Sequence, residues 1–168
     1  MKAVLQRVKS ASVTVDGSLI SSIGKGILVF TAVAKEDSEK DAESMASKVL
    51  KFKIWDDENG GRWKRTVQDV GGEVLCVSQF TLLASTKKGN KPDFHNSASG
   101  EKAFELYKRF FGTVQQLYGP EKVKDGVFQA MMDVALVNDG PKSTRPQSLT
   151  HQEEVTFPKR ALMTSWEI

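Results

Sequence analysis

Three polar side chains end the most apolar segment of the chain. Residues 73–83 read EVLCVSQFTLL, where Ser78, Gln79 and Thr81 follow a run of residues typical of a buried strand. A buried hydroxyl or amide without a partner costs roughly 1–3 kcal/mol. Two explanations remain open at this point. These groups bond to neighbouring loops, or they line a polar cleft where a ligand completes their hydrogen bonds.

The residue types favour positioning over covalent catalysis. Thr81 has a nucleophilic hydroxyl, but the sequence indicates no adjacent base, and no Ser-His-Asp or Cys-His arrangement is found. Cys76 lies among hydrophobic residues and is predicted to be a small core residue. With one cysteine and two histidines far apart in the chain, we expect no metal site and no cofactor.

Length and composition indicate one ordinary globular domain. The chain has 168 residues, of which 39% are hydrophobic and 27% are charged, with a net charge of +3. No apolar run approaches the roughly 20 residues that span a bilayer, and no signal segment is seen, so we expect a cytoplasmic protein without membrane contact. The mild positive charge permits an anionic partner without requiring one.

The pattern of hairpins and two amphipathic helices predicts the α+β class. Strands are expected at 1–8, 11–15, 18–23, 27–33 and 127–137, with the last one broken at 138–141, and Asp16–Gly17 predicts a hairpin turn. Residues 73–83 are expected to form a central strand, because both of its faces are apolar at the start. Asp37 or Ser38 caps a first helix, and Ser97 or Ser99 caps a second that ends at Gly119. A short strand at 52–55 is expected to pair with part of 63–70.

Four segments together resemble the D-aminoacyl-tRNA deacylase family: KAVLQRVKSASVTVDG at the start, SQFTL at 78–82, KGNKPDFH at 88–95 and NDGP at 138–141. The resemblance implies a twisted, barrel-like mixed sheet packed by two main helices, working as a homodimer. It also implies hydrolysis of the ester that joins a D-amino acid, or glycine, to the terminal adenosine of tRNA. Aminoacyl-tRNA is therefore the expected partner, and DNA is not.

The resemblance also implies roles for individual residues. The wall of the site is implied for Ser78, Gln79, Phe80 and Thr81. The Gly140–Pro141 pair, with a cis peptide, reaches in from the other subunit to exclude L-amino acids. Arg7 steadies that pair, and the substrate's own ribose 2′-hydroxyl assists hydrolysis. Contacts to the terminal adenine are implied for Phe128 and Met132, which would otherwise be ordinary core residues.

The chemistry of an activated ester agrees with these roles. Hydrolysis needs positioning and an oxyanion site more than a strong base, and N–H groups near Phe80 and Thr81 suit that purpose. A rigid main-chain wall would reject every L side chain by steric clash and would let glycine pass. The basic loop of Lys87, Lys88 and Lys91 is the candidate for tRNA phosphates, although such a run is most often a solvated loop.

Two departures from the family pattern stand out. Gln129 occupies a position where the family usually has glycine. After Pro141 the family continues with Val-Thr, whereas this chain has Lys142 and Ser143 and reaches Val-Thr-Phe only at 155–157. We therefore expect a deacylase domain at 1–141 and a divergent tail at 142–168, in which 142–154 is either an insertion before a final strand or part of a replaced tail. The alternative function is a catalytically impaired dimer that binds tRNA ends, and generic esterase action through Thr81 is a third hypothesis.

Overall fold

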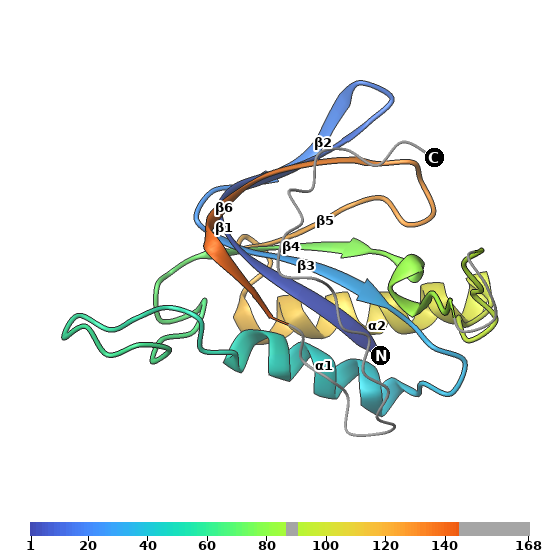
Figure 1. The fold of residues 1–168 in the computed structure, drawn as a ribbon, viewed down its shortest axis with the longest axis horizontal. Helices are drawn as coiled ribbons and strands as arrows, with labels where there is room; N and C mark the ends of the chain where they lie inside the picture. The colour runs from blue at the N-terminus through green and yellow to red at the C-terminus, as the bar shows by residue number, and fades with distance from the viewer. Residues whose placement is uncertain (87–90, 145–168) are drawn as a thin grey trace.

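One mixed sheet forms the body of the protein and two helices cover one of its faces (Figure 1). The computed structural model describes residues 1–86 and 91–144, with only the backbone described for 141–144. The strand order is β2-β1-β3-β4-β5, and β6 pairs with β1. The strands are β1 (Lys2–Val15), β2 (Ser18–Ile23), β3 (Gly26–Ala32), β4 (Glu73–Ser78), β5 (Val123–Asp125) and β6 (Asp133–Thr144).

The long strand β1 serves two hydrophobic cores. Its first half buries Ala3 and Leu5 against the helices, and its second half buries Val8, Ala11 and Val13 in an inner core. Its pairing with β6 is irregular around Val8, where the strand changes phase. The prediction of two strands at 1–8 and 11–15 was therefore wrong, because these irregularities allow one strand to continue.

The central position predicted for β4 is confirmed. It lies between β3 and β5 and runs parallel to both. Val74 and Cys76 belong to the core under the helices, while Leu75 and Val77 belong to the inner core. Because both faces are covered, the sequence of this strand is apolar on both sides.

The two predicted helices are confirmed, and each begins after one of the serines predicted as its cap, although the Ser99 side chain forms no capping hydrogen bond. Helix α1 (Glu39–Lys51) begins after Ser38, whose side chain forms a capping box with Asp41. These hydrogen bonds from Ser38 lower the pKa of Asp41. Helix α2 (Gly100–Tyr118) begins after Ser99 and ends at Gly119, where φ is +113°. Neither helix of the described chain is long and apolar enough to span a membrane.

The region after β5 differs most from the sequence prediction. A strand over 127–137 was expected, but β5 ends at Asp125 and β6 begins only at Asp133. Between them the chain turns, and Gln129 has a positive φ of 62°. The predicted break at 138–141 is confirmed as an interruption of the pairing between β6 and β1, which steps from Asn138 to Ser143, but the strand does not end there and continues to Thr144.

Candidate active site

The SQFTL segment ends β4 with a tight turn. The strand stops at Ser78, and Phe80–Leu83 form the 3₁₀ helix η1, so the prediction of a strand through Leu83 was wrong. The N–H of Leu82 bonds to the carbonyl of Gln79, as the 3₁₀ pattern requires. In the described part of the chain, the N–H groups of Phe80 and Thr81 have no backbone acceptor. No side-chain acceptor is found for either group in that part of the chain, so both donors lack a protein partner there.

Hydrogen bonds fix this turn to the carboxyl end of the central strands. The N–H of Gln79 donates to the carbonyl of Thr31 at 2.8 Å, and its side-chain amide donates to Oγ1 of Thr81 at 2.5 Å. Lys2 Nζ donates to the carbonyl of Leu82 at 2.8 Å. The pairing of Lys2 with Ala32 places Lys2 at the same end of the sheet as Gln79. Sequence reasoning missed Lys2 and Thr31, because nothing in the sequence marks a residue that bonds to a distant carbonyl.

The ring of Phe80 lies at the surface of the turn. Its side chain is 58% exposed and meets the ring of Phe94 edge to face, with 5.1 Å between ring centroids. Phe94 comes from the loop before α2 and was not predicted as a site residue. The two aromatic side chains therefore form an exposed apolar surface beside the free N–H groups.

Arg7 is buried and holds the segment before Gly140. Its Nε and Nη2 donate to the carbonyl of Asp139 at 3.1 and 2.9 Å, and Nε lies 3.0 Å from Asp139 Oδ2. Nη1 donates to the carbonyl of Ile54 at 2.7 Å, and the guanidinium lies over the ring of Trp55. The planar guanidinium is suited to several fixed acceptors at once. Arg7 therefore joins Asp139 to the segment that follows α1.

Gly140 has a φ of 71°, a conformation that favours glycine. The resemblance implied a cis peptide between Gly140 and Pro141, but no peptide bond is cis within 1–86 and 91–144. This pair lies where the ladder between β6 and β1 is interrupted, because Val8 pairs with Asn138 and the next paired residues are Gln6 and Ser143. The chain crosses this irregularity through the positive φ of Gly140, and pairing with β1 resumes at Ser143.

The two residues expected to contact adenine lie in different environments. The ring of Phe128 packs against Phe104 and Tyr107 of α2, at centroid distances of 5.2 and 5.6 Å. Met132 packs on the inner core, and its sulfur accepts the N–H of Val127 at 3.3 Å. Both side chains are only half-buried, so each retains a surface for a ligand.

Gln129 lies in the turn between these two residues. Its positive φ explains why the family usually has glycine at this position, since other residues cost roughly 1–2 kcal/mol in this conformation.

The basic loop is described in part. Lys91 is exposed, whereas Lys87 and Lys88 lie outside the described residues, as does the segment 155–157. His95, interpreted as a residue that braces its loop, has its Nδ1 2.5 Å from Asp93 Oδ2. This pair holds the loop that carries Phe94.

A buried polar group lies beside β4. The hydroxyl of Tyr107 donates to Asp125 Oδ1 at 2.5 Å, and Cys76 pairs with Asp125 across the sheet. Burial raises the pKa of the Asp125 carboxyl, against the lowering effect of its hydrogen bond from Tyr107. Burial also raises the pKa of Cys76, which is fully buried, and this agrees with its predicted place in the core. An uncharged buried thiol is not a ready nucleophile.

The raised pKa of Asp125 predicts a pH-dependent effect of Asp125→Asn. The folded protein holds this proton more tightly than the unfolded chain, so the carboxyl contributes less stability as pH rises through about 4, its usual pKa. The variant lacks this penalty and its amide oxygen still accepts from Tyr107. Its free energy of unfolding, relative to the parent, is expected to increase between pH 4 and pH 7 in urea titrations. Asp69→Asn is the control with opposite sign, because hydrogen bonds from Thr66 lower the pKa of Asp69. A relative stability that is equal at both pH values would contradict the prediction.

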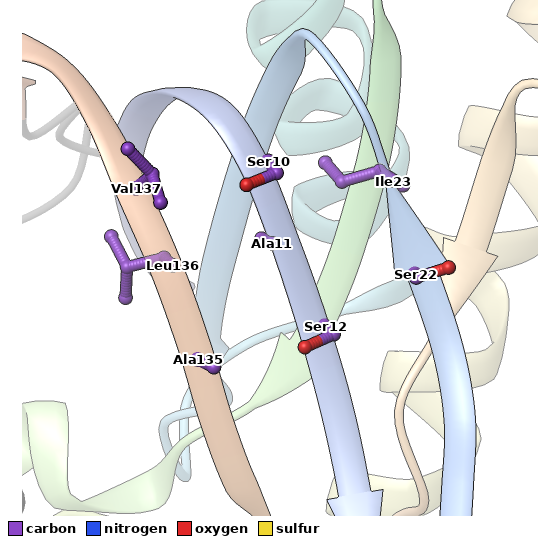
Figure 2. Close-up of a pocket in the computed structure, with 8 residues that line it drawn as sticks. All are labelled: Ser10, Ala11, Ser12, Ser22, Ile23, Ala135, Leu136 and Val137. Carbon is purple, nitrogen blue, oxygen red and sulfur yellow. The ribbon is translucent and has the colours of Figure 1, made fainter.

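A separate groove of about 240 Å³ lies on the three strands β6, β1 and β2 (Figure 2). It is lined by serine hydroxyls and small or branched apolar side chains, among them Ser12, Ile23 and Val137. None of the predicted site residues lines this groove.

Comparison with known proteins identifies the family. The family model for D-Tyr-tRNA(Tyr) deacylase matches residues 4–145. The D-aminoacyl-tRNA deacylase of Yarrowia lipolytica is 56% identical over 144 residues, which cover 84% of this chain and 93% of that protein. D-aminoacyl-tRNA deacylase 1 of Bos taurus is 46% identical over 160 residues, which cover 95% of this chain and 76% of that protein.

Two solved structures agree with this fold. The c-Myc DNA unwinding element binding protein matches with a TM-score of 0.84 and 47% identity, over 88% of this chain and 99% of that one. A probable eukaryotic D-amino acid tRNA deacylase matches with a TM-score of 0.74 over 86% of this chain and 97% of that one, and at 16% identity it supports the fold alone.

The fold and these matches place the protein among ester hydrolases that act on aminoacyl-tRNA. The chain belongs to the D-Tyr-tRNA(Tyr) deacylase family, and its activity is D-aminoacyl-tRNA deacylation.

Proposed function

We propose that the chain hydrolyses D-aminoacyl-tRNA at η1 and that a second copy of the chain supplies the filter that rejects L-amino acids. The free N–H groups of Phe80 and Thr81 carry this proposal. Two adjacent donors stabilise the oxyanion that forms when water attacks the ester carbonyl. The ester is already activated, so correct placement of these donors supplies much of the catalysis.

Thr81 has a supporting role in this proposal. Its hydroxyl oxygen accepts a hydrogen bond from Gln79, and no side-chain base contacts it among the described residues. A nucleophilic threonine would need such a base. The ribose 2′-hydroxyl of the substrate assists hydrolysis instead. Ser78 and Gln79 hold the turn in place at the end of β4.

The filter comes from Gly140 and Pro141 of the second subunit. Phe80 is 58% exposed in the single chain, so a wall that excludes L side chains has to come from elsewhere. Gly140 lets the main chain approach a substrate closely, and Arg7 holds the preceding carbonyl rigidly. A main-chain wall excludes every L side chain and lets glycine pass, so glycyl-tRNA is also a substrate.

The remaining site residues bind the tRNA. Phe128 and Met132 receive the terminal adenine on their exposed surfaces, since aromatic side chains stack on unpaired bases. Lys87, Lys88 and Lys91 bind phosphates of the acceptor end.

Mixed dimers of two impaired variants test the shared site. Phe80→Pro removes one oxyanion donor and is expected to reduce the rate about 10²- to 10³-fold, whereas Phe80→Ala keeps the N–H and serves as its control. Gly140→Val forces a branched residue into a positive φ and adds a side chain where the proposed wall meets the substrate, so this variant alone is also expected to lose hydrolysis of the D-ester. When equal amounts of the Phe80→Pro and Gly140→Val chains are unfolded and refolded together, half of the dimers contain both and each has one intact site. About a quarter of the parent activity is then expected to return.

The mixing experiment separates the alternatives directly. No recovery in proven mixed dimers would place both elements in one subunit and would contradict the shared site. Binding of tRNA by the parent without turnover of any D-ester would instead favour the impaired binding protein. Loss of activity in Thr81→Ala, with Gly140 variants fully active, would favour generic esterase action.

A further inference from the structure

A hairpin between α1 and β4 projects from the body of the protein (Figure 1). We call residues 51–65 the basic hairpin. Trp55 and Arg65 close its base, with the N–H of Arg65 donating to the carbonyl of Trp55 at 3.0 Å. None of the predicted site residues belongs to it, although Ile54 and Trp55 at its base contact Arg7.

The acidic side chains of the basic hairpin are bound within it. Asp57 Oδ1 accepts the N–H groups of Asn59 at 3.0 Å and Gly61 at 2.6 Å. Asp56 Oδ1 accepts the N–H of Trp63 at 3.2 Å, and Glu58 pairs with Arg65 at 3.3 Å. These carboxylates are therefore engaged locally.

Three basic side chains of the hairpin, in contrast, are exposed to solvent. Lys53, Arg62 and Lys64 are exposed and form no ion pair within the described residues. Arg62 and Lys64 flank Trp63, whose side chain is 43% exposed. An exposed indole between two free cations offers both charge and an aromatic surface, the combination that proteins use to bind RNA backbones and unpaired bases.

Arg7 fixes the basic hairpin relative to the filter. The same guanidinium that binds the carbonyl of Asp139 also donates to the carbonyl of Ile54, at the base of the hairpin. Arg62 is three residues from Arg65, so it lies at most about 11 Å along the chain from that base. In the proposed dimer, Gly140 borders the η1 turn of the other subunit. The basic hairpin of one subunit would then stand beside the site of its partner.

We propose that the basic hairpin binds the acceptor end of the tRNA, with Arg62 and Lys64 on its phosphates and Trp63 against a ribose or an unpaired base. This inference rests on the proposed function, because it needs a tRNA whose 3′ end occupies η1. It assigns the hairpin to affinity for the RNA, not to the chemical step.

Two substrates distinguish a role of the hairpin in binding RNA from a role in the chemical step. The first is full-length D-tyrosyl-tRNA, and the second is D-tyrosyl-adenosine, which is too short to reach the hairpin. In Arg62→Gln/Lys64→Gln, kcat/KM on the full tRNA is expected to fall about tenfold through KM, with kcat unchanged. Hydrolysis of the short ester should equal that of the parent. The slope of log affinity for uncharged tRNA against log salt concentration should decrease in magnitude by about 1.4–1.8, since two phosphate contacts are lost.

A matched control removes the same charge elsewhere. Lys25→Gln/Lys40→Gln changes two exposed lysines outside the hairpin and away from η1 and Phe128, and is expected to keep parental affinity and salt dependence. Equal losses in both double variants, a loss on the short ester, or an unchanged KM for tRNA would each overturn the inference. If the parent itself fails to hydrolyse the D-esters, the proposed function fails, whereas normal parental activity with no effect of the hairpin variant rejects only this inference.

Discussion

D-tyrosyl-tRNA is expected to be hydrolysed at least about 100-fold faster than L-tyrosyl-tRNA, a difference of roughly 2.7 kcal/mol in activation free energy. The two substrates differ only in where hydrogen and side chain point from one carbon atom. Arg7 holds the carbonyl of Asp139, and the proposed wall of main-chain atoms has no rotamer with which to relieve a clash, so we expect steric exclusion of the L form. The measurement is the first-order decay of each ester at the same enzyme concentration.

Glycyl-tRNA provides the internal control for this experiment. It has no side chain to collide with the wall, so it is expected to be hydrolysed as well as the D-ester. Both L and D esters also hydrolyse spontaneously, and that rate without enzyme is subtracted. Equal enzymatic rates on the D and L forms would reject the filter, whatever the rate on glycine.

Arg7→Met is expected to lower the free energy of unfolding by about 3–5 kcal/mol, the largest stability effect we predict. The change leaves the carbonyls of Ile54 and Asp139 without their donor and the Asp139 carboxylate without its cation. Each buried polar group that loses its partner adds to the cost. Urea unfolding measures the effect, and a folded but weakened variant should also hydrolyse more L-ester relative to D-ester.

Two further variants locate the cause. Arg7→Lys keeps the charge but cannot reach both carbonyls with a planar group, so it is expected to recover only part of the stability. Arg109→Met removes an exposed arginine that pairs with Glu43 on α1 and should leave the unfolding curve unchanged. Full rescue by Arg7→Lys would show that charge alone matters and that the fixed geometry of the guanidinium does not.

Local signals in the sequence predicted much of the fold. The capping box of Ser38, the start of α2 after Ser99, the Asp16–Gly17 turn and the doubly covered strand β4 all follow from short-range patterns, and the structure confirms them. The turn has positive φ at both residues, as a tight hairpin requires. Such features depend on a few neighbouring residues, so sequence alone is sufficient to find them.

The errors arose where distant pairing decides the backbone. Nothing in SQFTL marks the change from strand to 3₁₀ helix after Ser78, which the bond from Gln79 to Thr31 accompanies. Likewise the segment 138–141 interrupts the pairing with β1 as predicted, but nothing in the sequence indicates that β6 resumes beside Gln6 at Ser143. The partners of Arg7 were also hidden, because its acceptors are main-chain carbonyls that any residue could supply.

The path of β1 through both cores has a consequence for how the protein unfolds. Because β1 contributes side chains to both cores, the core under the helices cannot unfold while the inner core stays folded. Unfolding of either core would therefore disrupt the other. Slow hydrogen exchange of the β1 amides would then report global unfolding of the protein.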